Sequence, residues 1–145
     1  MLNYTTTIAP AKSIGEMQTM LARHGASAVA TRYTKGEPSG LSFTLATPVG
    51  ERAYTLPVNV DGVLAALRAD PKVRRANSRY ITPEHATRVA WRVAKDWLEA
   101  QLAIIEANMA SLDQVMLPYL HVDGELTMYQ AFLDQQTRAI EGGAS

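Results

Sequence analysis

The stretch from residue 82 to residue 109 reads TPEHATRVAWRVAKDWLEAQLAIIEANM and predicts the longest helix of the chain. Thr82 is a preferred N-cap residue, Pro83 fits the first helical position, and Glu84 places an acid in the first turn. Apolar side chains then follow with helical periodicity: Val89, Val93, Trp97, Leu98, Leu102, Ile105 and Met109. We therefore expect a helix over Pro83–Met109.

The sequence on either side of this helix is also helical. Upstream, Asn59 is expected to cap a short helix over Val60–Ala69, and residues 71–81, which show no clean period, are interpreted as an irregular segment. Downstream, Ser111 and Gln114 match a capping box. Thr127 is the expected N-cap of a last helix whose apolar side chains are predicted to be buried: Met128, Tyr129, Phe132 and Leu133.

Residues 1–60 show the alternating pattern of strands. Strands are expected over four segments: Asn3–Ile8, Ala28–Tyr33, Leu41–Leu45 and Ala53–Val58. Ser13 and Glu16 match a further capping box, which predicts a helix over Ile14–His24. Close turns between the last three strands favour an antiparallel meander. The prediction is an α+β fold in a single domain, residues 1–145. An N-terminal, mostly antiparallel sheet of about four strands with one helix (residues 1–60) precedes a helical half (residues 61–145) led by one long helix.

Composition excludes several classes of protein. The chain has 145 residues, 47% of them hydrophobic, and no cysteine, which rules out thiolate catalysis, Cys-ligated zinc and disulfide scaffolds. No apolar run reaches the roughly 18 residues that span a bilayer. The segment Met1–Ile8 lacks the basic and apolar regions of a signal peptide. We expect a cytoplasmic protein that does not bind a membrane.

Catalytic and metal sites are not expected from the sequence. The three histidines are scattered along the chain and form no Ser-His-Asp or His-x-x-x-His arrangement: His24, His85 and His121. Three acids of the long helix project from neighbouring faces without a histidine at ligand spacing, and a solvated or docking face is the better interpretation: Asp96, Glu99 and Glu106. We predict a non-enzymatic protein without a cofactor or a metal.

Charge is sorted along the chain although the net charge is zero. Residues 68–95 carry eight basic and two acidic side chains, a net charge of +6, whereas residues 96–145 carry one basic and eight acidic ones, a net charge of −7. A basic segment with nearby aromatic side chains can neutralise phosphates and stack bases. The candidate nucleic-acid or phosphate-binding residues are Lys72, Arg74, Arg75, Arg79, Tyr80, Arg88, Trp91, Arg92 and Lys95.

Two observations count against this interpretation. On a helix, Arg92–Asp96 and Lys95–Glu99 are i,i+4 partners, so the basic face of the long helix could be an internally paired, solvated face. The sequence pI of 6.8 is also below the value of about 9 that is typical of dedicated nucleic-acid-binding domains.

The C-terminal half resembles a family of small uncharacterised proteins of phages and integrated mobile elements. The similarity lies in RVAWRVAKDWLEAQ (residues 88–101) and QVMLPY (residues 114–119), and in the N-terminal Tyr-Thr-Thr segment with the helix that follows it. No activity is assigned to that family, so no functional residue can be transferred. The resemblance implies that an accessory gene of a bacterial virus encodes the protein and that the protein acts in the host cytoplasm. It favours two classes of function, nucleic-acid accessory proteins and small inhibitors of host defence.

We therefore consider two hypotheses. The first is a non-enzymatic phage-type accessory protein that binds nucleic acid through the basic segment 68–95. The alternative is an anti-defence protein that inhibits a host factor by protein–protein contact, or that sequesters a signalling nucleotide with its arginines. The opposite charges of the two segments leave a homodimer open as well. Apolar residues of the C-terminal region also favour a partner: Met116, Leu117, Tyr119, Leu120, Met128 and Phe132.

Overall fold

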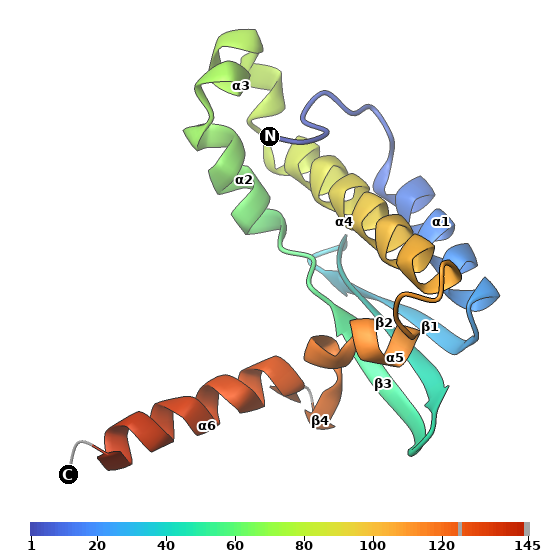
Figure 1. Cartoon of the computed structure of the whole chain (residues 1–145). Helices are drawn as coiled ribbons and strands as arrows, with labels where there is room; N and C mark the ends of the chain where they lie inside the picture. The colour runs from blue at the N-terminus through green and yellow to red at the C-terminus, as the bar shows by residue number, and fades with distance from the viewer. Residues whose placement is uncertain (125, 144–145) are drawn as a thin grey trace.

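The computed structural model describes residues 1–124 and 126–143 and has an α+β fold (Figure 1). The helices are α1 (Pro10–Arg23), α2 (Val60–Ala69), α3 (Pro71–Ala76), α4 (Pro83–Glu106), α5 (Leu112–Val115) and α6 (Met128–Gly143), with 3₁₀ turns η1 (Ser78–Tyr80) and η2 (Leu117–Tyr119). The strands are β1 (Ala26–Thr34), β2 (Glu37–Thr47), β3 (Gly50–Leu56), β4 (His121–Asp123) and β5 (Leu126–Thr127).

The main sheet is an antiparallel meander with strand order β1-β2-β3. Phe43 in the middle of β2 lies opposite Val29 of β1 and Tyr54 of β3, and its ring stacks on that of Tyr54 at 5.3 Å between centroids. Alternate residues of β2 and β3 are buried because α1 and α4 cover one face of the sheet (Figure 1). The three strands predicted in this region are confirmed. The first two lie within the longer β1 and β2, whereas β3 begins at Gly50 and ends at Leu56, two residues before the predicted end at Val58.

The long helix is confirmed, and it begins where the sequence predicts. The side chain of Thr82 accepts a hydrogen bond from the backbone N–H of His85 at 3.1 Å, as an N-cap residue does. The helix ends at Glu106, three residues before the predicted end. Asn108 has a φ of 57°, a left-handed conformation that asparagine tolerates and that ends a helix.

The N-terminal segment differs from the prediction. Residues 3–8 form no strand, so the main sheet has three strands rather than about four. The first helix begins at Pro10 instead of Ile14, because proline fits the first helical turn. Ser13 and Glu16 form no capping box: both side chains accept hydrogen bonds from Arg92 of α4.

Residues 71–81 are more ordered than predicted. They form α3 and η1, whose N-cap residues are Asp70 and Asn77. Each of these side chains accepts a hydrogen bond from a backbone N–H two residues later. A second apolar cluster of Leu67, Val73 and Ala86 fixes α2 and α3 on the N-terminal end of α4. The α2–α3 pair therefore projects as a defined end of the molecule (Figure 1). The predicted helix Val60–Ala69 is confirmed, with its Asn59 cap.

In the C-terminal region, the predicted helix caps are confirmed, but the predicted burial of the last helix is wrong. The capping box of Ser111 and Gln114 is present, and Thr127 accepts a hydrogen bond from the Gln130 backbone N–H. However, α6 extends away from the body (Figure 1), and none of its described residues is buried. Tyr129, Phe132 and Leu133 were expected in the core but are exposed, and Met128 is half-buried. No helix among the described residues combines the length and apolarity that crossing a bilayer requires.

Candidate phosphate-binding site

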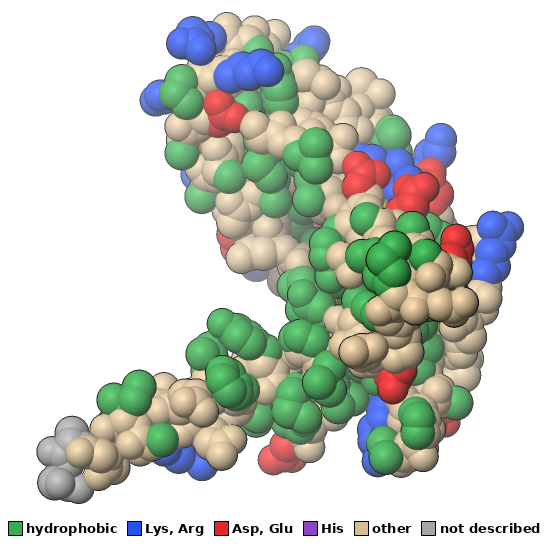
Figure 2. Space-filling view, viewed as in Figure 1, with side chains coloured by type: hydrophobic (Ala, Val, Ile, Leu, Met, Phe, Trp, Pro, Cys, Tyr) green, Lys and Arg blue, Asp and Glu red, His purple; other side chains and the backbone are tan. Residues whose placement is uncertain are grey.

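Five basic side chains gather at the projecting end of the molecule, which we call the basic tip: Arg68 of α2, Lys72, Arg74 and Arg75 of α3, and Arg79 of η1. All five are exposed. Figure 2 shows Lys and Arg side chains around this end of the chain. The α2–α3 turn brings them together, because Asp70 and Pro71 end α2 and start α3 within two residues.

Little negative charge balances the basic tip. Among the described residues, Arg68, Arg74 and Arg75 form no ion pair. The one acid nearby in sequence is Asp70, whose carboxylate accepts hydrogen bonds from the Met1 amine at 2.6 Å and from the Lys72 backbone N–H at 3.0 Å. These bonds, the one from the amine first, hold the pKa of Asp70 below its usual value. Asp70 is thus engaged, and the arginines face solvent.

Aromatic rings form the base of the basic tip. The guanidinium of Arg79 lies over the Tyr80 ring at 5.1 Å and donates a hydrogen bond to the Tyr80 hydroxyl at 3.1 Å. Tyr4 meets the same ring edge-on at 5.6 Å, and His85 lies 5.1 Å from it. With three neighbours around the ring, Tyr80 offers a ligand its hydroxyl rather than a free ring face.

A cavity of about 310 Å³ lies next to the basic tip. It is lined by the three consecutive threonines Thr5–Thr7 and by Arg79, Tyr80, His85 and Arg88. We call it the threonine–arginine cavity. The cavity lies between the N-terminal segment on the one hand and η1 with the first turns of α4 on the other, which are more than 70 residues apart in sequence. The sequence predicts a strand over these threonines. The run of three hydroxyl side chains is the one feature of the sequence that could have indicated a binding site here.

The orientation of Arg88 is fixed by its neighbours. Nε2 of His85 lies 2.5 Å from the carbonyl oxygen of Tyr4. A carbonyl only accepts, so Nε2 carries the proton and Nδ1 is left as an acceptor. Arg88 donates to this Nδ1 at 3.3 Å, and its other terminal nitrogen donates to Glu84 at 3.3 Å. Glu84 is itself 83% exposed, so it neutralises Arg88 only weakly.

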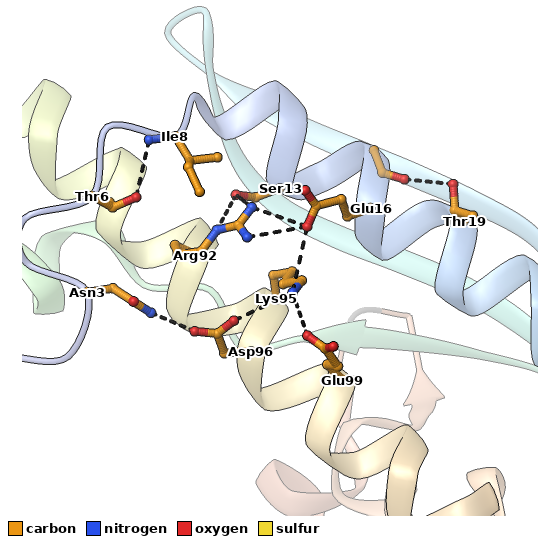
Figure 3. Close-up of polar contacts among 11 residues, drawn as sticks. Asn3, Thr6, Ile8, Ser13, Glu16, Thr19, Arg92, Lys95, Asp96 and Glu99 are labelled. Atoms are coloured by element: carbon orange, nitrogen blue, oxygen red, sulfur yellow. Dashed lines mark hydrogen bonds and ion pairs between the residues drawn. The ribbon is translucent and has the colours of Figure 1, made fainter.

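Three of the predicted site residues do not belong to this surface. Trp91 is fully buried in the main core, and its Nε1–H donates to the Pro38 carbonyl at 3.0 Å. Arg92 is 8% exposed and donates to Ser13 and Glu16 of α1 (Figure 3). Including Trp91 and Arg92 in a binding surface was wrong, because α4 is covered on several sides and both side chains point into protein.

Lys95 is also engaged within the chain (Figure 3). Its ammonium pairs with Glu99 one turn later and lies 3.7 Å from both Glu16 and Asp96. These contacts, led by the hydrogen bond to Glu99, raise the pKa of Lys95. The i,i+4 pair predicted for Lys95 and Glu99 is confirmed. The pair predicted for Arg92 and Asp96 is replaced: Arg92 binds Glu16, and Asp96 accepts from the Asn3 amide at 2.7 Å.

The remaining titratable groups are dispersed. The part of the chain that the structure describes holds no group of three or more His, Cys, Asp or Glu side chains able to bind a metal ion. His24 contacts Glu106 at 3.1 Å, and His121 contacts the Thr55 hydroxyl at 2.5 Å, each at a different place on the molecule. The strongest chemical feature is therefore the arginine-rich surface formed by the basic tip and the threonine–arginine cavity.

No protein-family model matches the chain, and neither a curated protein nor a solved structure matches it.

Proposed function

We propose that this chain is a non-enzymatic phage-type accessory protein that binds nucleic acid through the basic tip and acts in the host cytoplasm. One observation carries the proposal: the cations of the basic tip, five side chains within twelve residues of sequence, lie together, exposed, with one engaged acid among them. Lysine and arginine side chains that neutralise phosphates release counterions, and this release supplies most of the affinity of sequence-independent binding.

The neutral total charge does not cancel this local charge. Apart from Glu84, which pairs with Arg88, the acids of α4 begin at Asp96, thirteen residues after Pro83. A helix rises about 1.5 Å per residue, so Asp96 lies roughly 20 Å along α4 from the end that carries the basic tip. Exposed charges are largely screened beyond about 10 Å at 0.1 M salt. Arg92 and Lys95 are paired with acids in that part of α4 and with Glu16, so the uncompensated positive charge is concentrated at the tip.

The salt dependence of binding tests the proposal. If all five cations neutralise phosphates, the slope of log affinity against log salt is about −3.5 for a single strand and about −4.5 for a duplex. Fluorescence anisotropy with labelled DNA and RNA of both kinds measures the slope. The double variant Arg74→Gln with Arg75→Gln should bind more weakly and reduce the single-strand slope by about 1.4.

The matched control changes the net charge equally at other places. Arg52 on β3 and Arg138 on α6 are both exposed and lie away from the basic tip. The double variant Arg52→Gln with Arg138→Gln should keep the affinity and the slope of the unmodified chain. Absence of binding at micromolar protein in low salt, or an equal loss in both double variants, would refute the proposed function.

A second candidate, self-association, is favoured by α6. Phe132 is 53% and Ile140 is 73% exposed on this helix, and an apolar cleft of about 380 Å³ lies between α2, α4 and Tyr119 of the same chain. Figure 2 shows hydrophobic side chains along α6 and around the hollow that separates α6 from α2. We propose that a second copy covers this helix, with each α6 seated in the apolar cleft of the other chain, as a two-fold exchange allows.

Light scattering at low and high salt tests self-association. We expect a dimer that survives high salt, because apolar burial and not exposed ion pairs would hold it. The double variant Phe132→Asp with Leu133→Asp should be a monomer, whereas Arg138→Gln should not. A 15.8 kDa species at every salt and concentration would refute the dimer. In that case the exposed apolar face of α6 would favour the alternative function, inhibition of a host protein. A pull-down from nuclease-treated host lysate would test whether a protein partner binds.

A further inference from the structure

The threonine–arginine cavity has the chemistry of a site for a terminal phosphate. Its volume of about 310 Å³ lies at the lower end of the roughly 300–1,000 Å³ that is usual for small-molecule sites. A cavity of this size suits one phosphate with its sugar and not a run of several nucleotides. The lining residues include two arginines and no carboxylate.

The charge of the cavity matches a phosphate monoester better than a phosphodiester. A monoester carries about −1.5 to −2 at pH 7, whereas each internal phosphate of a strand carries one negative charge. Arg79 and Arg88 approach from two elements, η1 and α4, and guanidinium groups bind phosphate oxygens in a bidentate manner. Glu84 pairs with Arg88 from a largely exposed position and neutralises it only weakly, so the two guanidinium groups around the cavity can balance a dianion.

Hydrogen-bond donors complete the site. The Tyr80 hydroxyl accepts from Arg79 at 3.1 Å, which leaves its own proton free to donate. The Thr6 hydroxyl accepts from the Ile8 backbone N–H at 3.2 Å and can likewise donate. His85 is a positioning residue: its ring bonds to Tyr4 on one side and holds the Arg88 guanidinium on the other.

We propose that the threonine–arginine cavity binds a terminal phosphate monoester, at the phosphorylated end of a nucleic-acid strand or on a free nucleotide. The strand form builds on the proposed function, because it names the group that enters next to the basic tip. Internal phosphates of the same strand would then contact the exposed arginines of α3.

The test compares oligonucleotides of one sequence that carry a 5′-phosphate, a 3′-phosphate or hydroxyl groups at both ends. In anisotropy titrations with the full chain, we expect one of the phosphorylated strands to bind about tenfold more tightly than the hydroxyl strand. Arg88→Gln and Tyr80→Phe, which removes only a hydroxyl, should each reduce this preference. Arg75→Gln should weaken binding of all the strands equally and keep the preference, and Arg52→Gln should change neither.

A second measurement separates the two sources of phosphate. In a thermal-shift experiment, a nucleoside 5′-monophosphate should raise the melting temperature more than the nucleoside, and Arg88→Gln should abolish the difference. Equal affinity for the phosphorylated and hydroxyl strands, with no shift by the monophosphate, would overturn the terminal-phosphate site and leave the proposed function standing. If no strand binds but the monophosphate shifts the melting temperature through Arg88, the proposed function is refuted and the site is supported as a nucleotide site.

Discussion

Replacing Arg92 by methionine is expected to lower the free energy of unfolding by about 2–3 kcal/mol. The side chain is 8% exposed, and its guanidinium donates to the Ser13 hydroxyl at 3.0 and 3.2 Å and to the Glu16 carboxylate at 3.2 and 3.3 Å. Without it, the fully buried Ser13 hydroxyl loses both donors, a loss worth about 1–2 kcal/mol because the hydroxyl is neutral. Glu16 is 33% exposed and keeps Lys95 at 3.7 Å, so its share is nearer 1 kcal/mol.

Urea unfolding followed by circular dichroism measures this loss. In a thermal melt the same change should lower the midpoint by roughly 6–10 °C for a chain of this size. The double-mutant cycle of Arg92→Met with Glu16→Gln should show a coupling energy of about 1 kcal/mol, since the two side chains touch. Arg75→Met, on the exposed face of α3, is the control and should change stability by less than about 0.5 kcal/mol.

A loss below about 0.5 kcal/mol in Arg92→Met would refute the reasoning. It would mean that Arg92 lies in solvent, on a solvated basic face of α4 of the kind that the sequence analysis left open. The contact between α1 and α4 would then owe nothing measurable to this ion pair.

Three further predictions concern stability and burial. Burial raises the pKa of Tyr54 above its ordinary value of 10.0, and the hydrogen bond to Glu99 raises the pKa of Lys95 above 10.5. As the pH rises, the unfolded chain therefore loses these two protons before the folded chain does. Urea unfolding should show full stability below pH 10 and a fall in the free energy of unfolding above it. Tyr54→Phe should flatten that fall, and an equally steep fall would contradict the assignment. Asn59→Ala should cost about 1 kcal/mol through loss of the α2 cap, and an unchanged midpoint would show the cap to be dispensable. In Trp97→Phe, iodide should fail to quench the remaining Trp91 fluorescence, whereas efficient quenching would place that ring at the surface.

The sequence by itself determined the local elements. Thr82 and Pro83 start α4, Asn59 starts α2, and Ser111 with Gln114 forms a capping box. These signals act within one turn of helix, between residues that are neighbours in the chain, so they hold in almost any tertiary setting. The alternation in β2 and β3 is similarly robust, because an antiparallel sheet with one covered face needs it.

The same local reasoning failed where a distant partner competed. Ser13 and Glu16 have the spacing of a capping box, but Arg92 of α4 takes both side chains. Charge-assisted hydrogen bonds in a nearly dry contact outweigh a cap on the surface. The exposure of α6 could not be predicted from the sequence either. Its apolar stripe indicates a face that packs against something, but it does not indicate which surface covers that face.

Only the tertiary structure decided which basic residues face solvent. Arg92 and the arginines of α3 are the same residue type within one basic segment, yet Arg92 points into the contact with α1 while Arg74 and Arg75 project from the α2–α3 end. Trp91 lies off the main apolar stripe of α4 but is buried, because the sheet and neighbouring helices cover more of α4 than one stripe. Thr5–Thr7 meet Arg88 only after the N-terminal segment folds back onto α4. Burial and long-range pairing depend on which elements pack together, and that information is spread over the whole chain and not over any one turn of it.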